Sequence, residues 1–535
     1  MRHGLVIGLV AGCGALLVGA CGSSSSTDDS VPEVEGGTSG TSGTSGTSGT
    51  SGTSGTSGTS GTSGNPDGGG DGGVPPLKST TLKAGNVVLV GVTKDATPHA
   101  VYISLGATNS LEAVPLAGGA PVVIAATLAD TDRPVVRGGA VAWYTAVNAT
   151  TGVGTINLWT KANGAKLAVA TNSALGLFTA TTDGTRVAFG VAATGGGAAA
   201  PVTATGLAIT GTATPSATAV LATGNKINLA AAAKDCSPDM AFVGGVFFGA
   251  YCTGTAQGSV NAQLVTVPAA STTPSVLIDN SPGIQPFWQP DTAGTKLFVI
   301  GLANGAANPN QGRIVTVAGP AFANLDDNTD DGFMLGDGSA AIWSVGTNLK
   351  TGATAAAAKT LASTVKSIID TSSDGKRMLF SALDPAPPDD TVDIRSIDTT
   401  TAAQPGVAIV ATATSLPVGF NAPGTHALYM TDLGATGAKL KSKPSLGGAE
   451  VLVADGVVGG VVPPTGTGVL LLTNPKKQGN VTLGDLSYTD SVAGGAPAAI
   501  NDSIPLSGGF VFSGKKLVYF RLAATNAGLF VADLP

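Results

Sequence analysis

A recurring strand-turn-strand unit constrains the fold of this chain more than any other feature. Its clearest copy is PFWQPDTAGTKLFVIG, residues 286–301, where an apolar run leads through a Pro-Asp turn with Gly294 into a second apolar run. Looser copies follow one another through the rest of the chain. A repeat of this kind cannot bury its apolar face alone, so neighbouring copies must stack on one another.

Aligning the apolar run that follows each turn glycine gives ten candidate units. They are AGNVVLVGV (from Ala84), RGGAVAWYT (Arg137), TDGTRVAFG (Thr182), VGGVFFGAY (Val243), AGTKLFVIG (Ala293), GDGSAAIWSV (Gly336), SDGKRMLFS (Ser373), PGTHALYMT (Pro423), TGTGVLLLT (Thr465) and SGKKLVYFR (Ser513). Glycine suits the turns because it adopts positive φ at little cost.

Most units continue with two further β-type runs around another glycine turn, as in INLWTKANGAKLAVA from Ile156. Four strands in about 45 residues is the arithmetic of a β-propeller blade. The sequence therefore predicts an all-β chain whose residues 77–535 form a propeller of four-stranded blades. About ten units are counted, and seven to ten blades are plausible; half-blades, one large ring and two propellers remain open. The final run, GLFVADLP, lacks a fourth strand, and the segment PPLKSTTLKAG from Pro75 is expected to supply it and close the ring.

Three units carry a further resemblance. PFWQPDTAGTKLFVIG, FTATTDGTRVAFG and IDTSSDGKRMLFS resemble the repeat of TolB-type propellers, in which a strand ends in Trp-Ser-Pro-Asp-Gly and a Lys-hydrophobic strand follows. Several other units lack the aspartate, and most lack the tryptophan. The resemblance implies a TolB-like or WD-like propeller, and the wider propeller class is the broader expectation.

The N-terminus reads as an export signal. Residues 1–20 have a basic start and a short apolar core, which is too short for a typical membrane span and fits a secretory leader. The end of this segment, Val18-Gly19-Ala20-Cys21, resembles the lipobox of bacterial lipoproteins. That resemblance implies cleavage before Cys21 and its lipidation, with an address at the bacterial outer membrane, on its periplasmic or surface side. A plain cleaved leader with a chance cysteine is the alternative.

A tether is predicted between the lipid and the body. Residues 21–76 are rich in Ser, Thr and Gly and include nine uninterrupted TSG triplets from Thr38 to Gly64. Such a composition has too little apolar area to offset the entropy of ordering it, so the segment is expected to be disordered.

Few residues of this sequence indicate chemistry. Of four cysteines, only Cys236 and Cys252 lie in the body, where they form either a disulfide or two buried thiols. An acidic loop offers Asp326, Asn328 and Asp330 as a weak Ca²⁺ candidate. It departs from a calcium loop because its glycine comes one residue late and no glutamate stands at the twelfth position. No other metal site, no cofactor and no catalytic constellation are predicted. The four tryptophans are expected to pack between blades.

The functional expectation follows from this combination. With a net charge of −7 and only 11% charged residues, the chain offers no basic surface for nucleic acid. We expect a membrane-anchored, extracytoplasmic and non-catalytic module that binds an envelope protein, peptide or glycan. The alternatives are a propeller enzyme of lyase or glycosidase type, which would need two converging carboxylates, and a structural or adhesive surface protein.

Overall fold

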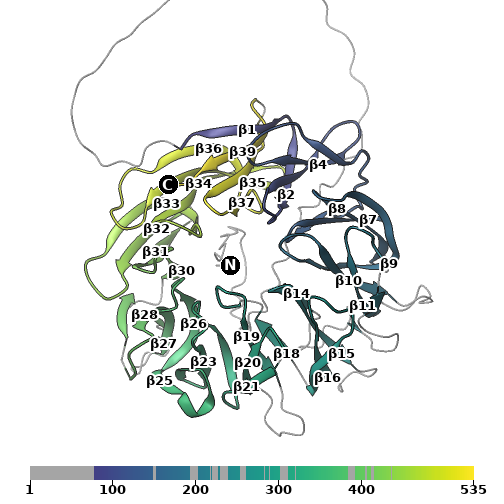
Figure 1. Ribbon diagram of the computed structural model, residues 1–535. Coiled ribbons are helices and arrows are strands. Elements are labelled where there is room, and N and C mark those ends of the chain that lie inside the picture. Colours follow the sequence, from purple (N-terminus) through teal and green to yellow (C-terminus); the bar gives the residue numbers. More distant parts are fainter. Residues whose placement is uncertain are drawn as a thin grey trace, which may run out of the picture.

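The computed structural model describes residues 77–535 with internal gaps at 149–151, 193–202, 217, 220–226, 229–238, 254–260, 282–283, 288–289, 302–310, 320, 384–391, 404–405, 411–414, 435–436 and 524. The described residues form antiparallel sheets arranged around a ring (Figure 1). The expected all-β propeller is confirmed. Cys21, Cys236, the leader at 1–20 and the tether at 21–76 lie outside the described residues.

Each blade has four strands, which we call A to D from the ring centre outward. Blade 1 comprises β2 (Val87–Val92), β3 (His99–Ser104), β4 (Ser110–Pro115) and β5 (Val122–Ala125), and blade 2 comprises β6 (Val135–Arg137), β7 (Ala140–Asn148), β8 (Val153–Thr160) and the first part of β9 (Gly164–Ala180). Blade 3 comprises the second part of β9, β10 (Arg186–Ala192), β11 (Thr203–Gly211) and β12 (Thr218–Ala219), with β13 (Ile227–Asn228) also paired with β11. Blade 4 comprises β14 (Asp239–Val243), β15 (Val246–Thr253), β16 (Asn261–Val267) and β17 (Ser275–Ser281), and blade 5 comprises β18 (Ile284–Phe287), β19 (Lys296–Gly301), β20 (Gln311–Thr316) and β21 (Ala321–Asn324).

Blades 6 to 10 continue around the ring. Blade 6 comprises β22 (Thr329–Met334), β23 (Ala341–Val345), β24 (Asn348–Gly352) and β25 (Lys359–Ala362), with the short 3₁₀ turn η1 (Ala355–Ala357), and blade 7 comprises β26 (Val365–Thr371), β27 (Arg377–Leu383), β28 (Val392–Asp398) and β29 (Val407–Val410). Blade 8 comprises β30 (Leu416–Phe420), β31 (His426–Gly434), β32 (Gly437–Pro444) and the first part of β33 (Val451–Val461), and blade 9 comprises the second part of β33, β34 (Gly468–Gln478), β35 (Val481–Asp490) and β36 (Ala498–Pro505). Blade 10 comprises β37 (Phe510–Ser513), β38 (Lys516–Arg521), β39 (Gly528–Asp533) and β1 (Ser79–Ala84).

Two long strands each serve two blades. β9 pairs with β8 through its first part and with β10 through its second, so it is strand D of blade 2 and strand A of blade 3. β33 joins blades 8 and 9 in the same way. The eight hydrogen-bonded sheets of the described residues therefore amount to ten blades.

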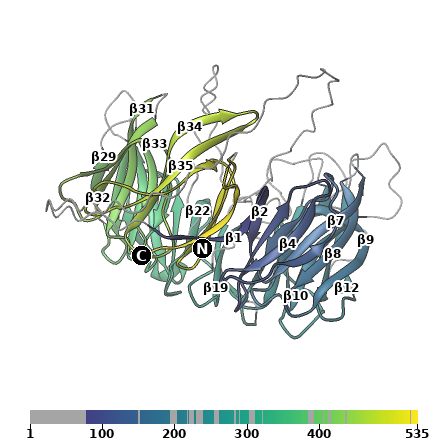
Figure 2. The same ribbon diagram turned by 90° about the horizontal axis from the view of Figure 1, so that it is seen from above.

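The ring is closed by its first strand. β1 pairs antiparallel with β39 from Ser79 opposite Ala532 to Ala84 opposite Gly528, which makes it strand D of the last blade. In Figure 2 it lies between the yellow C-terminal strands and the blue strands of blade 1. The expectation that the N-terminal segment completes the last blade is confirmed.

Side-chain contacts secure this closure on both sides. Tyr519 of β38 donates its hydroxyl to Ser79 Oγ at 2.6 Å. Lys83 Nζ lies 3.1 Å from Glu112 Oε2 in blade 1, and the Tyr102 hydroxyl donates to the same oxygen at 2.7 Å. The strand is therefore held by its own blade and by the next one.

The core formed by the described residues is divided into ten apolar clusters, and each cluster lies between two neighbouring blades. Strand β19 shows how alternation feeds both of its neighbours. Leu297 and Val299 pack against blade 4, whereas Phe298 and Ile300 pack against blade 6. One cluster joins blade 10 to blade 1, so the blades form one closed ring and not two propellers.

Three tryptophans have the expected packing role. Trp143 and Trp159 lie between blades 1 and 2, and Trp343 lies between blades 5 and 6, all at 3% exposure or less. Trp288 lies outside the described residues.

The repeat register holds for nine of the ten predicted units, whose apolar runs are the B strands. The first unit was assigned wrongly. Ala84 ends β1, Gly85-Asn86 is the link to β2, and Val87–Val92 is an A strand. The A–B turn of blade 1 comes later, at residues 93–98, where no Asp-Gly pair marks it.

Removing the closing strand should open the ring. A chain beginning at residue 85 loses the cover of the β39 edge, the packing of Leu82 against blades 10 and 1, and the Lys83–Glu112 ion pair. We expect its free energy of unfolding to fall by about 2 kcal/mol or more relative to a chain beginning at residue 77. Urea unfolding of both chains measures this, and equal stabilities would contradict a structural role for β1.

Candidate binding groove

The A–B turns lie at one end of the ring and differ in length. Blades 1 and 3 have long turns, at residues 93–98 and 181–185, whereas blades 2 and 4 turn within the glycine pairs Gly138-Gly139 and Gly244-Gly245. Long and short turns therefore alternate over these four blades.

The short turn of blade 2 is tucked against blade 3. A Cβ atom on Gly138 would lie 2.2 Å from the Thr181 carbonyl oxygen, and one on Gly139 would lie 2.6 Å from the Gly184 nitrogen. Gly138 also has a φ of +51°, which side chains rarely adopt. Glycine at both positions thus lets the two turns approach closely, and Gly139 N–H donates to the Thr181 carbonyl at 2.9 Å.

A groove of about 470 Å³ lies among these turns. It is lined from blade 1 by Lys94, Asp95 and Ala96, from blade 3 by Thr181, Thr182, Asp183, Thr185 and Arg186, and from blade 4 by Phe242, Gly244, Gly245 and Ala269. Its volume falls within the range of ligand sites in proteins.

The blade 3 wall is fixed by its own hydrogen bonds. Asp183 accepts from the Thr181 hydroxyl at 2.6 Å and from the backbone and hydroxyl of Thr185 at 3.0 and 2.9 Å. Burial raises the pKa of Asp183, but these hydrogen bonds outweigh it and leave the pKa below its usual value. The carboxylate is therefore charged at neutral pH.

Arg186 ties the blade 3 wall to blade 4. Its guanidinium donates to the carbonyls of Gly245 at 3.0 Å, Pro268 at 3.3 Å and Ser271 at 3.0 Å. It also lies 5.5 Å from the ring centre of Phe242, a cation–π distance. The two walls are thus held in fixed relation without a ligand.

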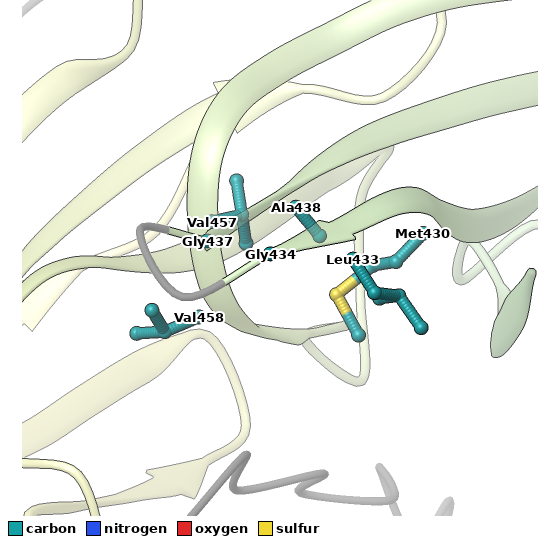
Figure 3. A pocket seen from close by; sticks show the side chains of 7 residues that line it. All are labelled: Met430, Leu433, Gly434, Gly437, Ala438, Val457 and Val458. Atoms are coloured by element: carbon teal, nitrogen blue, oxygen red, sulfur yellow. The ribbon is translucent and has the colours of Figure 1, made fainter. Parts of the chain in front are cut away.

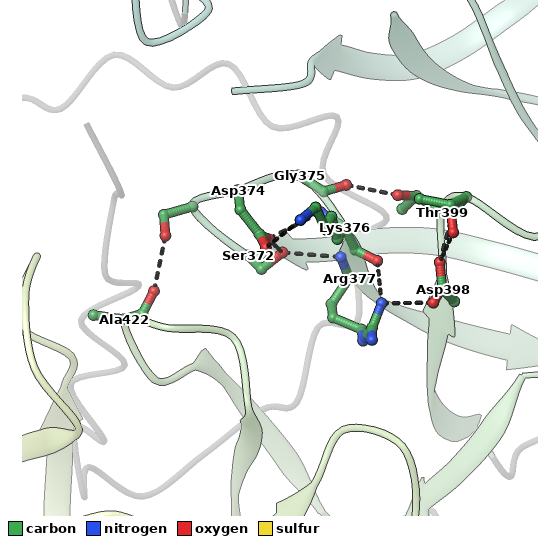
Figure 4. A network of polar contacts seen from close by, with 10 residues as sticks. Ser372, Asp374, Gly375, Lys376, Arg377, Asp398, Thr399 and Ala422 are labelled. Atoms are coloured by element: carbon green, nitrogen blue, oxygen red, sulfur yellow. Dashed lines mark hydrogen bonds and ion pairs between the residues drawn. The ribbon is translucent and has the colours of Figure 1, made fainter. Parts of the chain in front are cut away.

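The same turn chemistry recurs around the ring, and Figure 4 shows it in blade 7. Asp374 accepts from the Ser372 hydroxyl at 2.6 Å and from Lys376 N–H at 3.0 Å. Ser372 Oγ accepts from Arg377 N–H at 2.9 Å, and Arg377 pairs with Asp398 at 2.7 Å.

Among the described residues, five A–B turns close in this way, with a side-chain oxygen accepting from the backbone N–H five or six residues later. The accepting residues are Thr93, Thr181, Asp291, Ser372 and Asn421. The polar residues of the TolB-like repeat therefore stabilise turns, which explains their spacing without any catalytic role.

His99 lies directly behind the blade 1 wall. It is 2% exposed, its ring meets Trp159 edge-on at 5.9 Å, and its Nδ1 has no hydrogen-bond partner among the described residues. Burial is the main cause that lowers its pKa; Lys161 adds to this, whereas the Thr97 carbonyl and Asp95 oppose it. His99 is therefore held neutral.

The residues of the Ca²⁺ candidate have protein partners. Asp326 Oδ2 accepts from Lys350 Nζ at 2.8 Å and Trp343 Nε1 at 3.0 Å, and Asp330 Oδ2 accepts from Gly346 N–H at 2.8 Å. Asn328 lies between them with a φ of 57°. Within the described part of the chain, no three His, Cys, Asp or Glu residues are grouped as a metal site would require. Calcium binding stays a prediction without a geometric argument behind it.

Other sequence candidates can be placed only in part. Cys252 lies on β15 opposite Ala262, and its expected partner Cys236 is outside the described residues, so the disulfide stays a prediction.

Of the carboxylates on the inner A strands, Asp331 of β22 is notable because burial, together with neighbouring Asp330, raises its pKa to about 6. No helix among the described residues has the length and apolar character to cross a membrane.

A second hollow lies in blade 8, lined by Met430, Leu433, Gly434, Gly437, Ala438, Val457 and Val458 (Figure 3). Its volume of about 10 Å³ is no more than one water molecule needs. It is therefore a packing defect beside the β31–β32 hairpin and not a ligand site.

Comparison with known proteins gives structural likenesses only. No family model and no curated protein matches the sequence. Among solved structures, the tricorn protease matches over 78% of this chain and 44% of its own length, with 11% identity and a TM-score of 0.34. A putative TolB from Agrobacterium tumefaciens matches over 49% of this chain and 94% of its own length, with 14% identity and a TM-score of 0.27. A eukaryotic initiation factor matches over 74% of this chain and 94% of its own length, with 10% identity and a TM-score of 0.42. The propeller assignment rests on the strands and their pairing.

Sequence reasoning did not find the groove. Its residues belong to turns of three different blades, and none of them forms a motif. The available signal was the pair of Gly-Gly turns, RGGAV and VGGVF, beside turns that are three or four residues longer.

Acidification should test the state of His99. The unfolded chain binds a proton at histidine near pH 6.5, whereas folded His99 resists it, so stability is lost as pH falls below that value. The free energy of unfolding of a His99→Phe variant should fall less on acidification than that of the wild type. The difference between the two is at most about 1.4 kcal/mol per pH unit. Urea unfolding between pH 7.5 and 5 measures the difference, and His426, common to both proteins, cancels from it. Parallel pH profiles would contradict a buried neutral His99.

Proposed function

We propose that this chain is a non-catalytic binding module whose ligand, an envelope protein, peptide or glycan, contacts the groove on the A–B turns of blades 1, 3 and 4. The observation that carries the proposal is the groove itself, with its volume of about 470 Å³ and a mixed polar and apolar lining. Such a lining suits recognition of a ligand by hydrogen bonds and contact area.

The rigidity of the groove supports this function. Asp183 and Arg186 are held by hydrogen bonds within and between the blades, so the walls need no reorganisation when a ligand enters. A preformed site avoids the entropic cost of ordering loops on binding.

The setting of the module is proposed from its N-terminal sequence. A leader at residues 1–20, lipidation at Cys21 and a tether to residue 76 would hold the propeller at the outer membrane of a bacterium. A tether of this length and composition would span about 40 Å root-mean-square as a flexible coil, so the propeller could search for its partner away from the lipid surface.

Site-specific photocrosslinking tests the proposal in the cell envelope. Ala96 is an exposed residue of the groove, and Ala293 is an exposed residue of the equivalent turn in blade 5. With a photoreactive phenylalanine analogue at either position of the full-length chain, we expect a discrete adduct from Ala96 and none from Ala293. Mass spectrometry would then identify the partner.

The two positions also provide the contradicting result. Because both are exposed alanines in A–B turns, random collisions should label them equally. Equal labelling, or the absence of any adduct at Ala96 in a folded and exported protein, would refute the groove as the binding site.

A further inference from the structure

Strand β1 completes the last blade, and it is also the strand at which residues 1–76 join the propeller. Any pull on this N-terminal chain, whether from a lipid at Cys21 or from another attachment, enters the ring at Leu77. The pull acts on β1 before it acts on any other strand. How the propeller responds to tension is therefore decided first by how firmly β1 is held.

The direction of β1 lets it separate from β39 one residue pair at a time. Ser79, the residue of β1 nearest to the pulled end, lies opposite Ala532, after which only three residues follow. The hydrogen bonds of an antiparallel pair run across the strands. A pull at Leu77 with the C-terminus held therefore loads these bonds one after another from the Ser79 end, whereas a pull along two strands would load them together.

Little apolar packing opposes this separation. β1 is the outermost strand of its sheet, and none of its six residues is fully buried (Figure 1). Leu77 and Leu82 are partly buried where they pack against the clusters on either side of blade 10. By contrast β38, the B strand of the same blade, buries four consecutive residues. The rest of the blade should thus resist a force that detaches β1.

The carboxylate that holds β1 to blade 1 keeps other partners when the strand leaves. Glu112 lies 3.1 Å from Lys83 Nζ, and it also accepts from the hydroxyls of Tyr102 at 2.7 Å and Ser110 at 2.9 Å. Release of Lys83 therefore does not leave a buried carboxylate without a hydrogen bond, which would be the costly outcome.

The hydroxyl that holds the other end of β1 is placed in the same way. Tyr519 donates to Ser79 Oγ at 2.6 Å, and its oxygen accepts from Asn501 Nδ2 at 3.2 Å. The contact with Asn501 lies within blades 9 and 10 and does not involve β1. Both neighbours of the strand are therefore prepared to lose it and to take it back.

We propose that β1 is a tension-sensitive closing strand, which a pull on the N-terminal chain releases first and reversibly while the blades stay folded. Release uncovers the edge of β39 and undoes the closure of the ring. Until then the pull does not reach β2, which leads into the blade 1 wall of the groove at Lys94. The proposal does not depend on what the groove binds.

Optical-tweezers pulling on the full-length chain, with one handle at each terminus, tests the proposal. We expect the first event to free residues 77–86, a gain in contour length of at most about 36 Å at about 3.6 Å per residue. It should reverse when the force is lowered. Unfolding of a whole blade frees about 45 residues, so the two kinds of event differ clearly in size.

Two lysine variants assign the first event to β1. Lys83→Gln removes the ion pair with Glu112 and should speed the event about fivefold at a given force. Lys441→Gln is the matched control, because Glu450 of blade 8 accepts from Lys441 at 2.8 Å and from the Tyr429 hydroxyl at 2.6 Å. This variant removes the same kind of contact far from β1 and should leave the first event unchanged.

A disulfide provides the second test. Ser79→Cys with Ala532→Cys should abolish the first event in molecules whose bond is confirmed by mass spectrometry, and a reductant should restore it. The proposal is overturned if the first event has the size of a blade, if it does not reverse, if the disulfide leaves it in place, or if the two lysine variants change it equally.

Discussion

Apolar packing between neighbouring blades is the interaction on which the rest of this structure depends. Each sheet has two apolar faces, and each face can be buried only against another blade. The ten clusters satisfy both faces of every blade, as the alternation of Leu297 and Phe298 on β19 shows. A linear array would leave two faces exposed at its ends, so the packing requires a ring, and the ring requires β1 to complete its last blade.

This arrangement separates the packed strands from the turns that differ between blades. The strands are committed to inter-blade packing, so variation between blades is confined to the turns at the two ends of the ring. Among the described residues, five of the ten A–B turns are closed by a polar side chain, as at Ser372 and Asn421. Where two blades instead turn within glycine pairs, a groove forms among their longer neighbours. The groove thus arises from a difference in turn length, without any change to the blades themselves.

The sequence predicted what is local and repeated, and it missed what depends on neighbours. Alternating apolar residues after a turn glycine identified nine B strands, and the unmatched final strand pointed to closure by the N-terminal segment. The unit that begins at Ala84 was wrongly aligned with the B strands, because a link between blades can contain a glycine just as a hairpin turn does. The number of blades and their single ring could not be deduced, since half-blades and two propellers fit the same repeat. The groove escaped prediction for a related reason, because Lys94, Asp183 and Phe242 are adjacent only when blades 1 to 4 are stacked.

The central claim of this account is that β1 and β39 close a single ring in a defined register, and cysteine trapping tests it most directly. Ser79 lies opposite Ala532, so Ser79→Cys with Ala532→Cys places two thiols on facing positions of the closing pair. The account predicts a disulfide between residues 79 and 532, identified by mass spectrometry of non-reduced peptides. It predicts much less bonding when Val531, whose side chain points to the other face, replaces Ala532 as the partner. Failure of the first pair to bond, or equal bonding in both, would contradict the closed ring.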